Sequence, residues 1–177
     1  MPMASPRLVV LMGVSGCGKS TIGKGLSLAL GWPFRDADSF HPPANIEKMS
    51  RGVPLDDADR WPWLSAIAQW IDAQRAVGAP GIVSCSALKR AYREHMIGAR
   101  QGVRLVYLKG DMGLIAGRLA RRKGHFMPPG LLQSQFDALE EPLQAERPLV
   151  VGIVPPPEDV VAAIIAQLGA AEAARSD

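Results

Sequence analysis

The stretch Gly13-Val-Ser-Gly-Cys-Gly-Lys19-Ser20 decides the fold, because it matches the pattern GxxxxGK[ST] at every fixed position. A wholly apolar run over residues 8–12 precedes it, and a helical pattern over residues 19–30 follows it. In this strand–loop–helix context the glycines let backbone N–H groups converge on phosphate oxygens, and the helix N-terminus adds the positive end of its dipole. The stretch therefore predicts a site for a nucleoside triphosphate.

Several residues of this loop have an expected role. Lys19 is expected to reach the β- and γ-phosphates of ATP as a catalytic residue, and the Ser20 hydroxyl is expected to ligate Mg²⁺. Cys17 precedes a helix N-terminus, where the pKa of a thiol can fall, so a reactive thiol is one interpretation and a small filler residue is the other. The residues expected to contact ATP here are Gly13, Val14, Ser15, Gly16, Cys17, Gly18, Lys19, Ser20 and Thr21.

Strand and helix patterns alternate along the rest of the chain. Further strands are predicted at residues 32–35, 81–85, 103–108 and 149–154. Further helices are predicted at residues 45–50, 62–77, 88–97, 113–122, from about 130 to 139, and 158–168. The fold class is therefore α/β, in three layers, with a parallel sheet of about five strands flanked by helices. A length of 177 residues predicts one domain over residues 1–177.

Composition excludes several classes of protein. Apolar residues make up 47% of the chain and charged residues 21%, a globular balance with a net charge of only +3. Long runs of like charge are absent from the sequence, so a nucleic-acid partner is not expected. The two cysteines form no CxxC pair, which argues against a disulfide framework or a zinc site. The apolar runs are too short for a membrane span, so the predicted location is the cytoplasm, with no membrane partner.

Two aspartates follow the second predicted strand. The third strand ends without an acid, so Asp36 and Asp38 are the candidates to assist the magnesium site. Residues at alternate strand positions point the same way, so both carboxylates are expected to face the ligand crevice. Asp36 is assigned to water-mediated Mg²⁺ binding and Asp38 to the role of catalytic base. The alternative is a turn that uses aspartate for local hydrogen bonds.

A polar region, roughly residues 36–64, follows with little apolar periodicity. His41, Lys48 and Arg60 are the substrate-binding candidates here, together with Asp38. Such a set suits a polyhydroxylated acceptor, and the Arg60 guanidinium suits a carboxylate. A solvated surface loop is the equally open alternative.

These motifs resemble the acceptor region of gluconokinases of the small P-loop type. The resemblance runs from residue 8 to about residue 142 and rests on Asp36-Ala-Asp-Ser-Phe-His41, Asn45-Ile-Glu-Lys48, Asp57-Ala-Asp-Arg60-Trp-Pro-Trp63, Cys85-Ser-Ala-Leu-Lys89-Arg-Ala-Tyr92-Arg93, Lys123-Gly-His125-Phe-Met-Pro128 and Gln135-Phe136. It implies ATP-dependent phosphorylation of the 6-hydroxyl of D-gluconate to 6-phosphogluconate, which feeds the pentose phosphate route. It also implies the fold of shikimate kinases and a homodimer, and it adds Lys89 to the substrate-binding residues.

The resemblance further implies a mobile lid over roughly residues 118–130. Arg118 and Arg122 are then expected to contact ATP, and Arg122 is the chosen transition-state contact, with Arg121 or Lys123 as alternatives. The chain departs from the family pattern after the last strand, where Pro155-Pro-Pro157 occupies the loop expected to border the adenine.

Two other interpretations stay open from the residues alone. One is a different small-molecule kinase on this fold, such as a shikimate or nucleotide kinase. The other is a nucleotide switch that binds partners, which the lack of NKxD and of a strand ending in DxxG disfavours.

Overall fold

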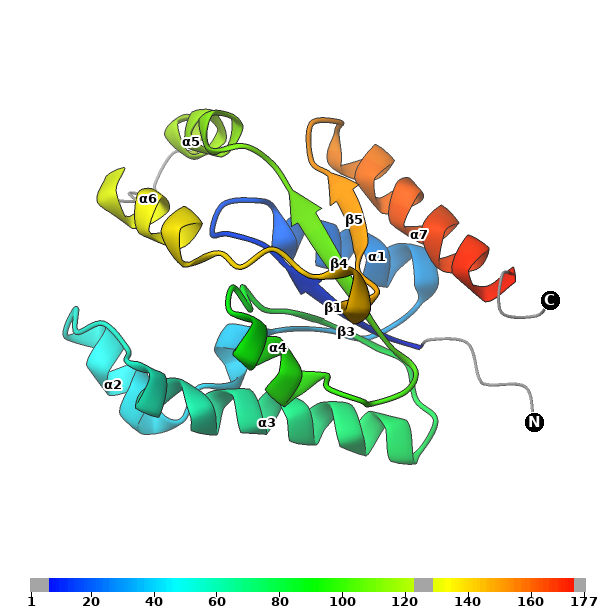
Figure 1. Cartoon of the computed structure of the whole chain (residues 1–177), viewed down its shortest axis with the longest axis horizontal. Helices are drawn as coiled ribbons and strands as arrows, with labels where there is room; N and C mark the ends of the chain where they lie inside the picture. The colour runs from blue at the N-terminus through cyan, green and yellow to red at the C-terminus, as the bar shows by residue number, and fades with distance from the viewer. Residues whose placement is uncertain (1–6, 123–128, 174–177) are drawn as a thin grey trace.

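Five parallel strands form the sheet in this computed structural model, in the spatial order β2-β3-β1-β4-β5 (Figure 1). The structure describes residues 7–122 and 129–173. Because all strand pairs are parallel, the carboxyl ends of the strands meet at one edge of the sheet. The strands are β1 (Leu8–Met12), β2 (Phe34–Asp36), β3 (Gly81–Ser84), β4 (Val103–Lys109) and β5 (Leu149–Gly152).

Helices connect the strands and cover the sheet. Within the described ranges, none of them combines the length and the apolar character that a membrane crossing needs. They are α1 (Lys19–Leu30), α2 (Pro43–Ser50), α3 (Asp57–Ala76), α4 (Arg90–Met96), α5 (Met112–Arg121), α6 (Pro129–Ala138) and α7 (Pro157–Ala173), with short 3₁₀ helices η1 (Ala37–Phe40) and η2 (Gln144–Glu146).

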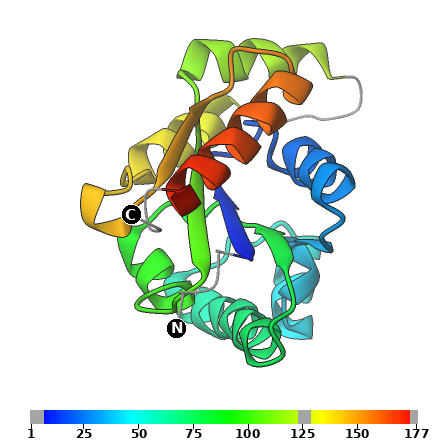
Figure 2. The ribbon, with the colours of Figure 1, turned by 90° about the vertical axis from the view of Figure 1, so that its right-hand side faces the viewer.

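Burial of β1 explains why helices lie on both faces of the sheet. All its residues are buried, and alternate side chains of a strand point to opposite faces. Val9 and Leu11 pack in one core with residues of α1 and α7, whereas Leu8 and Val10 pack in the other with residues of α3 and α4. Figure 1 and Figure 2 show these helix pairs on opposite sides of the strands. The predicted three-layer α/β fold is confirmed.

The start of α3 differs from the prediction. Apolar spacing placed the first turn at Pro62, but the helix begins at Asp57 and Pro62 lies inside it. Asp56 Oδ1 accepts a hydrogen bond from the Asp59 N–H at 2.8 Å, and the Asp59 carboxylate accepts one from the Asp56 N–H at 3.1 Å. This reciprocal capping box satisfies N–H groups at the helix start, so it sets the boundary.

Candidate active site

The phosphate loop joins β1 to α1 at the carboxyl edge of the sheet. Gly16 has φ 87° and Gly18, which caps α1, has φ 97°, a left-handed backbone that favours glycine. Among the described residues no side chain caps α1, and its first turn carries no acid, so its N–H groups suit an anion. Lys19 Nζ donates to the carbonyl oxygens of Gly13 and Val14 at 2.9 and 3.1 Å, which holds the ammonium over the loop.

Helix α6 supports the tip of this loop. Gln135 Oε1 accepts hydrogen bonds from the Ser15 N–H at 3.1 Å and from the Ser15 hydroxyl at 3.2 Å. Gln135 therefore restrains the position of Ser15 from a distant part of the chain. No role was predicted for Gln135, whose only signal in the sequence was its place in the family pattern.

Ser20 and Asp36 lie side by side where α1 begins and β2 ends. Ser20 Oγ donates to Asp36 Oδ2 at 3.0 Å, so the two predicted metal-binding residues are close together. In the described part of the chain, no group of three or more His, Cys, Asp or Glu is arranged to hold a metal ion. Two hard oxygens fit Mg²⁺, which takes most of its ligands from phosphates and water.

The strand alternation that was used to orient Asp36 and Asp38 does not extend to Asp38. β2 ends at Asp36, and Asp38 lies in the 3₁₀ helix η1. Asp36 Oδ1 accepts a hydrogen bond from the Asp38 N–H at 3.0 Å, which stabilises this turn in place of an extended strand. The Asp38 side chain is nevertheless 87% exposed, so its carboxylate is accessible to a ligand at the same edge of the sheet.

His41 lies next to Asp38 but is buried, with only 5% of its side chain exposed. Its ring stacks on Trp63 with the centroids 4.4 Å apart, and its Nδ1 lies 3.3 Å from Asn45 Nδ2. Burial lowers the pKa of His41 against the opposing effect of Asp38, which favours a neutral ring. If Nδ1 accepts from Asn45, the proton lies on Nε2, which is 3.8 Å from Asp38 Oδ1. This geometry suits a residue that positions Asp38.

Lys48 is held by the first turn of α3. Its Nζ lies 2.8 Å from Asp59 Oδ2, on the carboxylate that closes the capping box. This hydrogen bond raises the pKa of Lys48 and lowers the pKa of Asp59. Asn45 Nδ2 donates to the Asp59 carbonyl at 2.9 Å, so the bond from Lys48 is one of two that fix α2 against α3. A substrate that contacts Lys48 would have to share it with Asp59.

Arg60 and Lys89, from different parts of the chain, converge on Asp57. Arg60 Nη1 is 3.4 Å from Asp57 Oδ1, and Lys89 Nζ is 3.5 Å from Asp57 Oδ2. The Tyr92 hydroxyl donates to Asp57 and accepts from Arg60 Nη1 at 3.2 Å. The hydrogen bond from Tyr92, helped by the charge of Lys89, holds the pKa of Asp57 below its usual range. We call Asp57, Arg60, Lys89 and Tyr92 the Asp57 cluster. Because its two cations share one carboxylate, the cluster can accept a second carboxylate from a ligand.

A cavity of about 300 Å³ borders the phosphate loop. The predicted ATP contacts Thr21, Arg118 and Arg122 line it, and Arg121 and Pro155 line it as well. The end of α5 and the loop after β5 therefore share a cavity with the phosphate loop. Of the predicted lid, Lys123 and the rest of residues 123–128 lie outside the described residues.

Cys17 is buried in this region, with 2% of the residue exposed. Its sulfur lies 3.9 Å from Lys19 Nζ, but burial raises the pKa of the thiol in spite of that charge. Burial and the raised pKa favour the interpretation of Cys17 as a small filler residue over that of a reactive thiol.

Comparison with known proteins agrees with this arrangement. The profile of the shikimate kinase family matches residues 15–150. A gluconokinase of Gluconobacter oxydans (strain 621H) is 50% identical over 137 residues, 77% of each chain. The thermoresistant gluconokinase of Escherichia coli (strain K12) is 43% identical over 159 residues, which cover 89% of this chain and 91% of its own.

Comparison with solved structures distinguishes likeness within the family from likeness of the fold alone. The crystal structure of a gluconokinase from Sinorhizobium meliloti 1021 matches with a TM-score of 0.84 at 43% identity, over 95% of this chain and 94% of that one. A shikimate kinase from Aquifex aeolicus covers 92% of this chain and 96% of its own with a TM-score of 0.59 at 17% identity, so that likeness shows the fold alone. Identity above 40% over most of the chain places this protein in the gluconokinase family of shikimate-kinase-like P-loop kinases.

Proposed function

We propose that this protein transfers the γ-phosphoryl group of ATP to the 6-hydroxyl of D-gluconate, giving 6-phospho-D-gluconate and ADP. Relatives named gluconokinase, 43% and 50% identical, support the reaction. The observation that carries it is the pairing of two sites at one edge of the sheet. The phosphate loop follows β1, and Lys89 of the Asp57 cluster follows the neighbouring strand β3. The two segments are joined by a hydrogen bond from the Gly13 N–H to the Ser86 carbonyl at 3.4 Å.

The Asp57 cluster is proposed to hold the carboxylate of gluconate. Arg60 and Lys89 supply two cations around one internal carboxylate, and a guanidinium matches a carboxylate with two parallel hydrogen bonds. The substrate carboxylate would then balance the local charge. Gluconate bound by this end can extend its chain of hydroxyls toward the phosphate loop, where the accessible carboxylate of Asp38 belongs to η1.

The chemistry requires alignment, charge stabilisation and removal of one proton. Asp38 is proposed to accept the proton of the 6-hydroxyl as that oxygen bonds to phosphorus. Lys19, with Arg122 or a neighbouring cation, is proposed to stabilise the charge that spreads over the transferring phosphoryl group. Ser20 and Asp36 would hold Mg²⁺, Asp36 through water, and the ion supplies positive charge to the phosphate oxygens.

A substrate panel tests the proposal. ADP release with Mg-ATP should be fast with gluconate and slow with shikimate, nucleoside monophosphates or no acceptor. Arg60→Ala should mainly raise KM for gluconate, because it removes a ground-state contact, whereas Asp38→Asn should mainly lower kcat. The control is Arg51→Ala, whose exposed pair with Glu47 lies outside the Asp57 cluster. Equal rates across the panel, or exchanged effects of the two variants, would overturn the assignment.

The resemblance to gluconokinases also supports a homodimer in the cytoplasm, where ATP is available. Light scattering coupled to gel filtration should give twice the chain mass of 18.9 kDa. A monomer at micromolar concentration would contradict this part of the proposal without affecting the reaction.

A further inference from the structure

Residues 85–89, which we call the β3–α4 loop, carry the chain from the sheet to Lys89 of the Asp57 cluster. The backbone of this loop has φ 46° at Ala87, a left-handed conformation that is costly for a residue with a side chain. The Ser86 carbonyl accepts the hydrogen bond from the Gly13 N–H, so the loop also borders the phosphate loop. A strained conformation of this kind persists only where the surrounding structure holds it.

Arg93 of α4 supplies that support. Only 1% of its side chain is exposed, and its Nη1 donates to the carbonyl oxygens of Ala87 at 2.8 Å and of Leu88 at 3.1 Å. Side chains of a helix lean toward its N-terminus, which brings this guanidinium against the loop that leads into α4. Arg93 therefore bonds the two consecutive carbonyls that come directly before Lys89.

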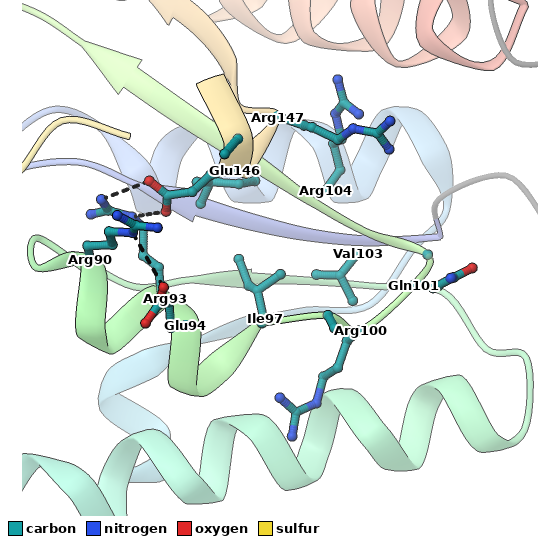
Figure 3. A pocket seen from close by; sticks show the side chains of 15 residues that line it. Arg90, Arg93, Glu94, Ile97, Arg100, Gln101, Val103, Arg104, Glu146 and Arg147 are labelled. Carbon is teal, nitrogen blue, oxygen red and sulfur yellow. Dashed lines mark hydrogen bonds and ion pairs between the residues drawn. The ribbon is translucent and has the colours of Figure 1, made fainter. Parts of the chain in front are cut away.

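Glu146 of η2 fixes the orientation of the same guanidinium (Figure 3). Arg93 Nε and Nη2 donate to the two oxygens of its carboxylate at 2.6 and 3.3 Å, in the wall of a cavity of about 400 Å³. The Glu140 N–H donates to the Leu88 carbonyl at 2.8 Å, so the segment that precedes η2 contacts the β3–α4 loop directly as well. With two nitrogens held by Glu146, the third is directed at the loop.

The buried charge of Arg93 has a geometric use beyond stability. A buried ion pair loses hydration, and apolar residues of similar volume can replace such a pair without loss of stability. An apolar side chain could not donate to the Ala87 carbonyl, on a residue that is itself only 3% exposed. The distinctive contribution of Arg93 is therefore the shape of the β3–α4 loop.

We propose that Arg93 is a positioning residue of the acceptor site, which holds the β3–α4 loop in its left-handed shape and thereby places Lys89 against Asp57. Lys89 Nζ lies 3.5 Å from Asp57 Oδ2, and Tyr92, the neighbour of Arg93 on α4, donates to the same carboxylate. Arg93 acts through Lys89 and needs no contact with the substrate. The effect on gluconate rests on the proposed function, whereas the placement of Lys89 can be measured without any substrate.

Titration of the Asp57 carboxyl, followed by NMR in the free protein, tests the placement. The hydrogen bond from Tyr92, and then the charge of Lys89, hold the pKa of Asp57 below its usual range, so displacement of Lys89 should raise it. Arg93→Lys keeps the charge but loses the planar set of donors, so it should raise the midpoint as Lys89→Gln does. Arg90→Lys, the same change at an exposed position of α4, should leave the midpoint unchanged.

Kinetics with gluconate test the consequence for the reaction. Arg93→Lys and Lys89→Gln should each raise KM for gluconate about tenfold, because one charge-assisted hydrogen bond is lost, while kcat stays nearly the same. The double variant should have the KM of Lys89→Gln alone, because Arg93 acts through Lys89. A residue that contributed only to stability would change neither the midpoint of Asp57 nor KM in the folded protein.

Arg93→Met combined with Glu146→Gln provides a second variant if Arg93→Lys does not fold. It removes both charges of the pair, so no buried charge is left without its partner, and it should also raise the midpoint of Asp57. An unchanged midpoint in both Arg93 variants, or additive effects of Arg93→Lys and Lys89→Gln on KM, would overturn the proposal. A wild-type protein that leaves gluconate unphosphorylated would instead overturn the proposed function, and the titration would still decide the role of Arg93.

Discussion

Replacing Glu146 with glutamine would remove one charge of its pair with Arg93 while keeping the shape of the side chain. Only 1% of the Arg93 side chain is exposed, and 14% of the Glu146 side chain. Arg93 Nε donates to Glu146 Oε1 at 2.6 Å, and Arg93 Nη2 donates to Oε2 at 3.3 Å. A glutamine amide offers one acceptor oxygen in place of two, so the variant would leave a buried guanidinium without its carboxylate.

The expected loss in the free energy of unfolding is about 3 to 5 kcal/mol, as when one partner of a buried ion pair is removed. An independent figure is similar, since unit charges about 4 Å apart attract by about 4 kcal/mol at an effective dielectric constant of 20. For a chain of 177 residues, about 2 to 4 °C of Tm corresponds to each kcal/mol. The Tm of Glu146→Gln should therefore fall by roughly 6 to 20 °C.

Urea unfolding followed by circular dichroism at pH 7 measures this loss. Glu94→Gln is the matched control, because Glu94 pairs with Arg90 at 3.4 Å on the surface, with side chains 61% and 47% exposed. Its loss should cost less than about 0.5 kcal/mol. If Glu146→Gln were no more than about 1 kcal/mol less stable than this control, burial would not be what makes the pair of Arg93 and Glu146 important for stability.

The same pair predicts a pH dependence. Burial alone would raise the pKa of Glu146, but hydrogen bonds from Arg93 and from the Leu143 N–H outweigh it and lower the pKa. A carboxyl group whose pKa is lowered in the folded protein stabilises the fold at pH values above its pKa in the unfolded chain, about 4.3. That stability is lost as the pH falls through the pKa of the folded state. The difference between wild type and Glu146→Gln should be complete at pH 7 and should shrink below about pH 4. An equal difference at pH 3 would contradict this.

Three further predictions concern the active-site edge. Asp56→Ala should lower the free energy of unfolding by about 1 kcal/mol in urea, because the capping box with Asp59 is lost; no change would mean that the cap is dispensable. Gly16→Ala should weaken ATP binding in calorimetry, because the new methyl would lie 2.8 Å from Leu119 Cδ2 on a backbone with φ 87°; an unchanged Kd would contradict this. Cys17 should react with iodoacetamide far more slowly in the folded than in the urea-unfolded protein at pH 8, because burial protects the thiol and raises its pKa; equal rates would contradict this.

Local signals explain which elements the sequence predicted well. α1 has its predicted bounds because a glycine in a left-handed conformation stands directly before and directly after it, Gly18 and Gly31. Both signals are adjacent to the helix in the sequence. α3 was predicted to start too late because apolar spacing and Pro62 suggested a first turn, while the true signal was a pair of aspartates three residues apart. Asp38 was expected to point the same way as Asp36 because period-two alternation was assumed beyond the residue where the chain turns.

Contacts between distant segments explain what the sequence could not predict about the site. Lys19 and Ser20 end one continuous sequence motif at the start of α1, so their placement followed from a local pattern. The convergence of Arg60 and Lys89 on Asp57 depends on how α3 packs beside α4, which no local pattern encodes. Tyr92 completes that cluster through the hydrogen bond from its hydroxyl to Asp57. In the sequence it could not be told from any aromatic residue of an amphipathic helix.

The first turn of α3 has a consequence for how such an enzyme can change its substrate. Within five consecutive positions, Asp56 and Asp59 fix the helix start while Asp57 and Arg60 form the proposed grip on the acceptor. A mutation that alters the proposed acceptor contacts is therefore expected also to destabilise the start of α3, which holds them in place. Laboratory selection for a new acceptor should first yield unstable proteins, and a compensating mutation elsewhere should be needed before a new specificity becomes usable.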